Sequence, residues 1–392
     1  MKNKKIDEAT CMLSENGQKM NDSGGQVASS FKSVILELRD FLTDTKQQLD
    51  VEERKIETAD REERTRIEAE ILDTVEKPVT EYIDQAITKM TEIVQILKPW
   101  EHRPYKEFFQ RHLHPLLLLS PFVKRAYTKP LGIPGDYEMM NMLYERHDQG
   151  DSLFARLINR YSCRVAAGRA VTTRVPYMLS NINQTIAKVL EKKESVSILN
   201  IGCGSAREIQ KLIETNPLSD RCRVTLIDVS PEALRYCHES LGELKKKTGS
   251  RIEIHCLHQS VYDLVHDAFY ALDLMGEQDL IYTIGLFDYL PRHVAKHVIR
   301  KLYGRLQEGG RLIVGNLSTM NTTRYYMEYV AEWYLLYRMP KEMVRLAEGI
   351  PSSRVSVDAN GEGTQLYLVI KKTMEEPIEK NSETMAVFHG AV

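Results

Sequence analysis

The fold of this chain is predicted most clearly by residues 195–208, S-V-S-I-L-N-I-G-C-G-S-A-R-E. The segment Val196 to Asn200 is a short run rich in branched apolar residues, which is typical of a buried strand. Gly202 and Gly204 follow where the strand ends, and glycine lets the backbone turn tightly and approach a ligand. A helical pattern comes next, and the free N–H groups at the start of a helix favour polar or anionic ligands. The stretch therefore predicts a strand, a ligand-binding turn and a helix.

The same alternation of short apolar runs and helical segments continues toward the C-terminus. Strands are expected at Val196 to Asn200, Val224 to Asp228, Ile252 to Cys256, Leu280 to Ile284 and Leu312 to Gly315. A helix is expected from Thr322 to Leu346, broken before Pro340. Two final strands, Arg354 to Asp358 and Gln365 to Ile370, flank a turn and predict a hairpin. The fold class is α/β, a doubly wound, Rossmann-like sheet of seven strands with a terminal antiparallel hairpin.

The N-terminal part of the chain has a helical pattern instead. Apolar residues between Phe31 and Leu97 recur at spacings of three and four, which indicates long amphipathic helices around a charged middle stretch, Glu52 to Glu70. A hairpin, a docking arm and a homodimer seam are the alternatives, and intramolecular packing is favoured because no heptad repeat is sustained. We expect a disordered leader (1–28), a helical region (29–175), an α/β domain (176–372) and a flexible tail (373–392).

Composition excludes several classes of protein. The formal net charge is -2, which argues against a surface that follows nucleic acid phosphates. The six cysteines are scattered, without the spacing of a metal site or a disulfide framework, so no metal is expected. The N-terminus lacks the apolar core of a secretory signal, and no stretch is long enough to span a bilayer. These features predict a cytoplasmic protein without a membrane span.

Asp228 is a further residue that indicates a ligand site at the glycine turn. It ends the next strand, so its carboxylate can lie beside the turn and accept hydrogen bonds from both ribose hydroxyls of a nucleoside-containing cofactor. A dinucleotide is disfavoured, because its fingerprint needs a third glycine where this chain has Arg207. Asn200, Cys203 and Val229 are expected to line the same pocket, with Cys203 as a small filler and not a nucleophile.

The ends of the third and fourth strands should complete the site, because ligands bind outside the carboxyl ends of strands in such sheets. The side chains expected to line the cofactor there are Gln259, Ser260, Gly285 and Phe287. Asp288 and Tyr289 follow in T-I-G-L-F-D-Y-L, and they either face the acceptor or form a structural corner. Upstream, the prolines and glycines of P-L-G-I-P-G-D-Y-E-M-M-N, from Pro130 to Asn141, fix a specific turn.

Taken together, the motifs resemble a known family. The glycine loop, the segment D-V-S-P-E-A-L, G-L-F-D-Y-L, G-G-R-L-I-V-G-N and the proline and glycine segment are similar to bacterial class I S-adenosyl-L-methionine-dependent methyltransferases. The relatives make 3-hydroxy fatty acid methyl esters, which are quorum-sensing signals. The resemblance covers roughly Tyr105 to Lys371. It implies that Gly202, Gly204 and Asp228 bind S-adenosyl-L-methionine and that Gly135 to Tyr137 close over it as a lid. The charged helices before Trp100 lie outside the resemblance.

A small-molecule acid is the acceptor that this resemblance implies. A carboxylate needs no general base, only a donor-rich clamp. The clamp candidates are Arg174, Tyr177, Asn316, His112 and His114. A hydroxyl or amine acceptor needs a base, and Asp288, Glu332 or a histidine are the candidates. The aromatic residues from Tyr325 to Tyr337 either wall an acyl tunnel or pack in a core. A protein that binds the cofactor without catalysis is the third alternative.

Overall fold

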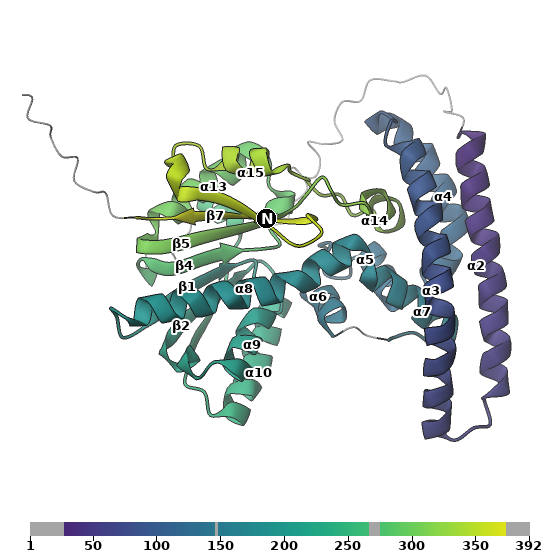
Figure 1. The fold of residues 1–392 in the computed structure, drawn as a ribbon, viewed down its shortest axis with the longest axis horizontal. Coiled ribbons are helices and arrows are strands. Elements are labelled where there is room, and N and C mark those ends of the chain that lie inside the picture. Colours follow the sequence, from purple (N-terminus) through teal and green to yellow (C-terminus); the bar gives the residue numbers. More distant parts are fainter. Residues whose placement is uncertain (1–26, 146–147, 266–274, 374–392) are drawn as a thin grey trace, which may run out of the picture.

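A computed structural model describes residues 27–145, 148–265 and 275–373 of the chain. The predicted leader up to residue 26 and the predicted tail from residue 374 lie outside these ranges. Figure 1 shows a twisted sheet with helices on both faces, and beside it a bundle of helices from the N-terminal region. The helix α14 lies between the two parts.

The sheet has seven strands in the order β3-β2-β1-β4-β5-β7-β6. β1 to β5 pair in parallel, whereas β7 is antiparallel to both β5 and β6. This confirms the predicted α/β sheet with its terminal hairpin. The strands are β1 (Val196–Ile201), β2 (Cys222–Asp228), β3 (Glu253–His258), β4 (Gln278–Thr283), β5 (Leu306–Leu317), β6 (Val355–Ala359) and β7 (Gln365–Lys371).

Helices cover both faces, as a parallel sheet with two apolar faces requires. On one face α8, α9 and α10 bury their apolar residues against β1, β2 and β4, and on the other face α13 and α15 do the same. The helices around the sheet are α8 (Ala166–Leu190), α9 (Arg207–Thr215), α10 (Pro231–Thr248), α11 (Val261–Val265), α13 (Arg292–Gly304), α14 (Arg324–Ala331) and α15 (Pro340–Leu346). Short 3-10 turns are η2 (Pro217–Arg221), η3 (Phe287–Tyr289) and η4 (Ser352–Arg354).

The expected helix from Thr322 to Leu346 is wrong over its middle third. α14 ends at Ala331 because Glu332 adopts a left-handed conformation with φ of 48°. That conformation costs a residue with a side chain roughly 1–2 kcal/mol, so other contacts must stabilise it. Residues 332–339 then run without helix, and Arg338 at their end donates to the carbonyl of Phe287. The helix is interrupted before Pro340, as predicted, but the non-helical segment is eight residues long.

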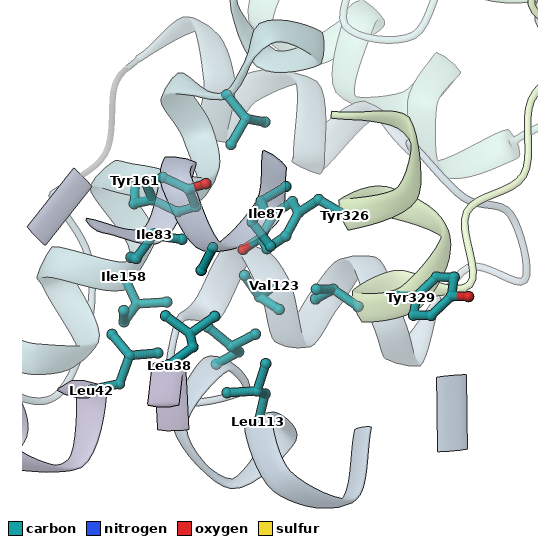
Figure 2. Close-up of a cluster of buried hydrophobic side chains, with 14 of the residues drawn as sticks. Leu38, Leu42, Ile83, Ile87, Leu113, Val123, Ile158, Tyr161, Tyr326 and Tyr329 are labelled. Carbon is teal, nitrogen blue, oxygen red and sulfur yellow. The ribbon is translucent and has the colours of Figure 1, made fainter. Parts of the chain in front are cut away.

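The helical region begins with a long hairpin. α2 (Ser29–Lys55) and α3 (Arg61–Val94) are joined by residues 56–60, and the carboxylate of Asp60 accepts from the first N–H groups of α3. The remaining helices are η1 (Pro99–Glu101), α4 (His102–Leu117), α5 (Pro121–Thr128), α6 (Tyr137–Tyr144) and α7 (Leu153–Arg164). Side chains of α2, α3, α4, α5 and α7 meet Tyr326 and Tyr329 of α14 in one buried cluster (Figure 2).

Ion pairs tie the hairpin to α7. Nη1 of Arg156 lies 2.7 Å from a carboxylate oxygen of Glu68, and Nη1 of Arg160 lies 3.0 Å from Glu76. Both arginines also pair with Asp148; burial alone would raise the pKa of this carboxyl, but the two guanidinium groups hold it at about 2. The apolar stripes of the hairpin are therefore buried against other helices of the same chain, and these ion pairs to α7 are intramolecular, as the favoured alternative predicted. Among the described residues, no helix combines the length and apolar character that crossing a bilayer requires.

Candidate active site

A cavity of about 330 Å³ lies where the carboxyl ends of the parallel strands meet the helical region. One end is polar and is lined by the glycine loop and by residues after β2. The other end is apolar and is lined by α5, α6, α7, α8 and α14. The predicted site residues along its wall are Tyr137, Arg174, Asn200, Gly202, Cys203, Gly204, Asp228, Val229, Gly285, Asp288 and Tyr289.

The glycine turn and Asp228 share the polar end. Gly202 and Gly204 have φ of 70° and 53°, in the region that favours glycine. The backbone N–H of Gly204 donates to Oδ2 of Asp228 at 2.9 Å, and that of Ser230 donates to Oδ1 at 2.9 Å. Burial raises the pKa of Asp228, while these N–H donors oppose the rise. The two motifs that the sequence placed in one pocket are in direct contact.

Glu208 lines the cavity but is not among the residues predicted from the sequence. Its carboxylate accepts from Nδ2 of Asn200 at 2.9 Å and from the hydroxyl of Tyr282 at 2.7 Å. Burial raises the pKa of Glu208 above its ordinary value. The signal was present, because Glu208 occupies the first turn of the helix after the glycine loop, where its side chain turns back toward β1.

Two polar atoms at this end have no hydrogen-bond partner although they are buried. They are Oδ1 of Asn200 and Oγ of Ser205, and both residues line the cavity. Buried polar groups without partners are rare and are usually satisfied by a ligand or water. The polar end therefore fits a cofactor with several hydrogen-bonding groups.

Arg174 and Asp288 mark the junction of the polar and apolar ends. Both are almost fully buried, with 6% and 3% of their surfaces exposed. Nε of Arg174 donates to Oε1 of Gln365 at 2.8 Å, but Nη2 lies 4.0 Å from Oδ2 of Asp288, beyond hydrogen-bond length. A Cβ added to Gly285 would lie 3.6 Å from Nη1 of Arg174, so the guanidinium group faces the end of β4. Burial raises the pKa of Asp288, and Arg174 opposes that rise.

The segment Ile133 to Tyr137 lies along the cavity at the junction with α14. Asp136 accepts from the N–H of Met139 at the start of α6, and Arg125 pairs with the same carboxylate at 2.9 Å. Gly135 has φ of 69°, and a Cβ there would lie 2.6 Å from Cζ2 of Trp333. The position therefore requires glycine, because the indole ring packs directly against the backbone.

Other predicted residues lie outside the cavity wall. They are His112, His114, Tyr177, Gln259, Ser260, Phe287, Asn316 and Glu332. Tyr177 donates its hydroxyl to Asp358 and stacks on Tyr367 instead. Asn316 bonds to backbone carbonyls of β5 and of the segment after α14, and Phe287 packs in the core beneath β4. Of the expected clamp residues, only Arg174 lines the cavity.

The aromatic stretch after Thr323 is divided between the cavity wall and the core of the N-terminal region. Tyr326, Met327 and Trp333 line the cavity, whereas Tyr329 packs among the helices of the N-terminal region. Within the described ranges, no cluster of three histidine, cysteine or acidic side chains is arranged to hold a metal ion.

Residues 199–312 match the family model of a methyltransferase domain. No curated protein is significantly similar to this chain. Solved structures with a similar fold include a possible exported protein from Bordetella parapertussis, which is 14% identical with a TM-score of 0.46 and covers 71% of this chain and 99% of its own. The N-methyltransferase NodS from Bradyrhizobium japonicum is 17% identical with a TM-score of 0.32, covering 50% and 97%.

A third structure is the magnesium protoporphyrin IX methyltransferase from Synechocystis with bound SAH, which is 10% identical with a TM-score of 0.36 and covers 52% of this chain and 87% of its own. The matched domain contains the glycine loop, Asp228 and the end of β4, which are the elements that form the polar end of the cavity. The chain carries a class I methyltransferase domain, and it is an enzyme that uses S-adenosyl-L-methionine as its methyl donor.

Proposed function

We propose that the enzyme methylates the carboxylate of a small acid with an apolar tail, such as a 3-hydroxy fatty acid, to give a methyl ester. One observation carries this proposal: the guanidinium group of Arg174 is buried in the cavity wall where the polar and apolar ends meet, and its nearest carboxylate, Asp288, is 4.0 Å away. Nε of Arg174 is satisfied by Gln365, but Nη2 is too far from Asp288 for a hydrogen bond, so this edge of the guanidinium group favours an anionic ligand that can accept from it. The hydroxyl at carbon 3 comes from the sequence resemblance alone.

The residues at the polar end of the cavity would bind the cofactor in this proposal. Asp228 would hold the ribose hydroxyls, and Glu208 with Asn200 would hold the ammonium group of the cofactor's methionine part. Bound S-adenosyl-L-methionine supplies an electrophilic methyl group next to a positively charged sulfur. Gly202 and Gly204 leave room for the cofactor because neither carries a side chain.

Catalysis in this proposal is a matter of position. Arg174 would fix the acceptor carboxylate with its Nη1 and Nη2 groups beside Gly285, and the apolar walls would exclude water. Holding two reactants in line can supply about 7–11 kcal/mol of the barrier reduction without any proton transfer. The side chains of Val123, Val171 and Tyr326 form part of the compartment that would take the apolar tail.

A hydroxyl or amine acceptor is the second candidate. It would need a base, and Asp288 is the named base candidate that lines the cavity. Its pKa is raised by burial, which brings it closer to the pKa that a general base needs near neutrality. A cofactor-binding protein without catalysis remains the third candidate, and it would show no product with any acceptor.

Product analysis separates these candidates. The enzyme would be incubated with S-adenosyl-L-methionine carrying a labelled methyl group and a mixture of 3-hydroxy fatty acids, matched fatty alcohols and alkyl amines. Mass spectrometry should find labelled methyl esters, and alkaline hydrolysis should release the label as methanol. Label that survives hydrolysis, in ethers or methylamines, would refute the carboxylate proposal in favour of the base-assisted one.

A cytoplasmic location is also part of the proposal. The described cysteines are thiols, which is usual in a reducing compartment. A homodimer through α2 and α3 would have to use their outward, charged faces, because their apolar stripes are buried against α4, α7 and α14.

A further inference from the structure

The C-terminal end of α14 is held by side chains from a different part of the chain. Nε2 of Gln110 donates to the carbonyl of Tyr329 at 3.0 Å, and Nε2 of His114 lies 2.9 Å from the carbonyl of Val330. Nζ of Lys129 donates to the carbonyl of Ala331 at 2.9 Å. Three successive carbonyls of one helix end are thus capped by α4 and by the residue after α5.

α14 needs such support. It has eight residues, and helices this short are marginal without tertiary contacts. The last four carbonyls of a helix have no partner within the helix. A cation at the C-terminal end also interacts favourably with the helix dipole, and Lys129 occupies that position. Lys106 reinforces the same end by pairing with Glu332 at 3.0 Å.

The supported helix is a wall of the acceptor cavity. Tyr326, Met327, Val330 and Ala331 of α14 line the apolar end, and Trp333 follows two residues later. Nε1 of Trp333 donates to the hydroxyl of Tyr289 at 2.9 Å. The same indole ring packs against the backbone of Gly135 in the predicted lid. A shift at the end of α14 would therefore move the wall, the lid contact and the end of η3 together.

We propose that Gln110, His114 and Lys129 are positioning residues that hold α14 at the distance from the sheet that the acceptor requires. The helical region thereby sets acceptor affinity, although none of the three side chains lines the cavity. This inference rests on the proposed function in one respect: it takes the apolar end as the acceptor's compartment. It gives Gln110, His114 and Lys129 a role that requires no contact with the acceptor.

Trp333 provides a readout that needs no acceptor. The chain has two tryptophans, and Trp100 is 62% exposed, so Trp100→Phe leaves Trp333 as the sole tryptophan, which excitation at the long-wavelength edge of the absorption band selects over tyrosine. In this background Lys129→Met removes the ammonium group and keeps the length of the side chain. Lys124→Met is the matched control, because Lys124 is exposed on α5 and caps nothing at α14.

Lys129→Met should move Trp333 emission to longer wavelength and increase its quenching by acrylamide at least twofold. The KM for the acceptor should rise about tenfold, with kcat and the Kd for S-adenosyl-L-methionine changing less than twofold. Lys129→Arg should restore both readouts, because it keeps a charged donor at the helix end. Lys124→Met should match the parent in all of them.

Two results would overturn the inference. One is unchanged Trp333 emission and unchanged KM in Lys129→Met and in the double variant Gln110→Met/Lys129→Met. The other is a loss of thermal stability that lowers acceptor and cofactor binding alike, which marks a merely structural role. If no carboxylic acid proves to be a substrate, the proposed function fails, but the Trp333 response still decides whether these residues position the wall.

Discussion

The two ends of the cavity are built in different ways. The polar end comes from residues 200–208 and Asp228, which are loops at the ends of two neighbouring strands. The apolar end comes from α5, α6, α7 and α8, which follow one another in the sequence, and from α14, which lies far from them in the sequence and meets them by packing. The sheet brings the cofactor's groups together by its topology, whereas the acceptor's compartment depends on long-range contacts. Substitutions at one end should therefore leave ligand binding at the other end intact.

Arg174→Met should have the largest effect, and it should impair turnover of the acceptor while leaving cofactor binding intact. Loss of a two-donor contact with a carboxylate should lower kcat/KM by at least about 100-fold, or about 2.7 kcal/mol. The Kd for S-adenosyl-L-methionine, measured by titration calorimetry, should change less than threefold, which also shows that the variant folds.

The control for this variant is Arg169→Met on the same helix. Arg169 pairs at the surface with Glu362, and its loss should leave activity within about twofold of the parent. Wild-type-like activity of Arg174→Met would show that Arg174 does not bind the acceptor carboxylate. An equal loss of cofactor affinity would instead move Arg174 to the cofactor's end.

Gly135→Ala should have a smaller effect, confined to the acceptor. Its Cβ would lie 2.6 Å from Trp333, so the indole ring or the lid must shift. We expect the acceptor KM to rise roughly tenfold in steady-state assays, as about 1.4 kcal/mol of lost binding implies. Gly132→Ala is a matched control: its φ of 75° is as strained, but a Cβ there meets nothing within 4 Å. Equal effects of the two substitutions would show that backbone strain, and not the Trp333 contact, is responsible.

The smallest expected effect is a proton released when the cofactor binds. Burial raises the pKa of Glu208, so its carboxylate begins to take up a proton at a higher pH than an exposed glutamate does. A bound ammonium group favours the ionised carboxylate, lowers this pKa and drives the proton off. Calorimetry in buffers of different ionisation enthalpy should show a fraction of a proton released, growing as the pH falls below neutral. Glu208→Gln should release less, and an identical proton count in both proteins would show that Glu208 does not face the ammonium group.

The sequence predicted the contact between the glycine turn and Asp228 for a physical reason, although Gln259, Ser260 and Phe287 were expected to line the cofactor and lie outside the cavity wall. A parallel strand that ends in Gly202 and Gly204 and a neighbouring strand that ends in Asp228 must place these residues side by side. The alternation of strands and helices likewise predicted the sheet and its terminal hairpin. Local periodicity was sufficient because the contacts follow from the topology.

The apolar end was predicted less well. The end of α14 at Ala331 depends on Gln110 and Lys129, which lie about 200 residues earlier and show no local signal. The same limit applies to Tyr177, which is three residues from Arg174 on α8 but bonds to Asp358 at the outer edge. Which helical residues face the cavity is decided by tertiary packing, and periodicity alone does not reveal it.

Binding of S-adenosyl-L-methionine to Asp228→Ala tests the central claim most directly. The claim is that the glycine turn and this carboxylate together hold the ribose of the cofactor. Titration calorimetry should find the Kd raised by at least roughly 100-fold, since each of two hydrogen bonds to a charged group contributes about 1.5–3 kcal/mol net of exchange with water. Circular dichroism would confirm that the variant keeps its fold. A Kd equal to that of the wild-type enzyme would contradict the claim and remove the cofactor from this pocket.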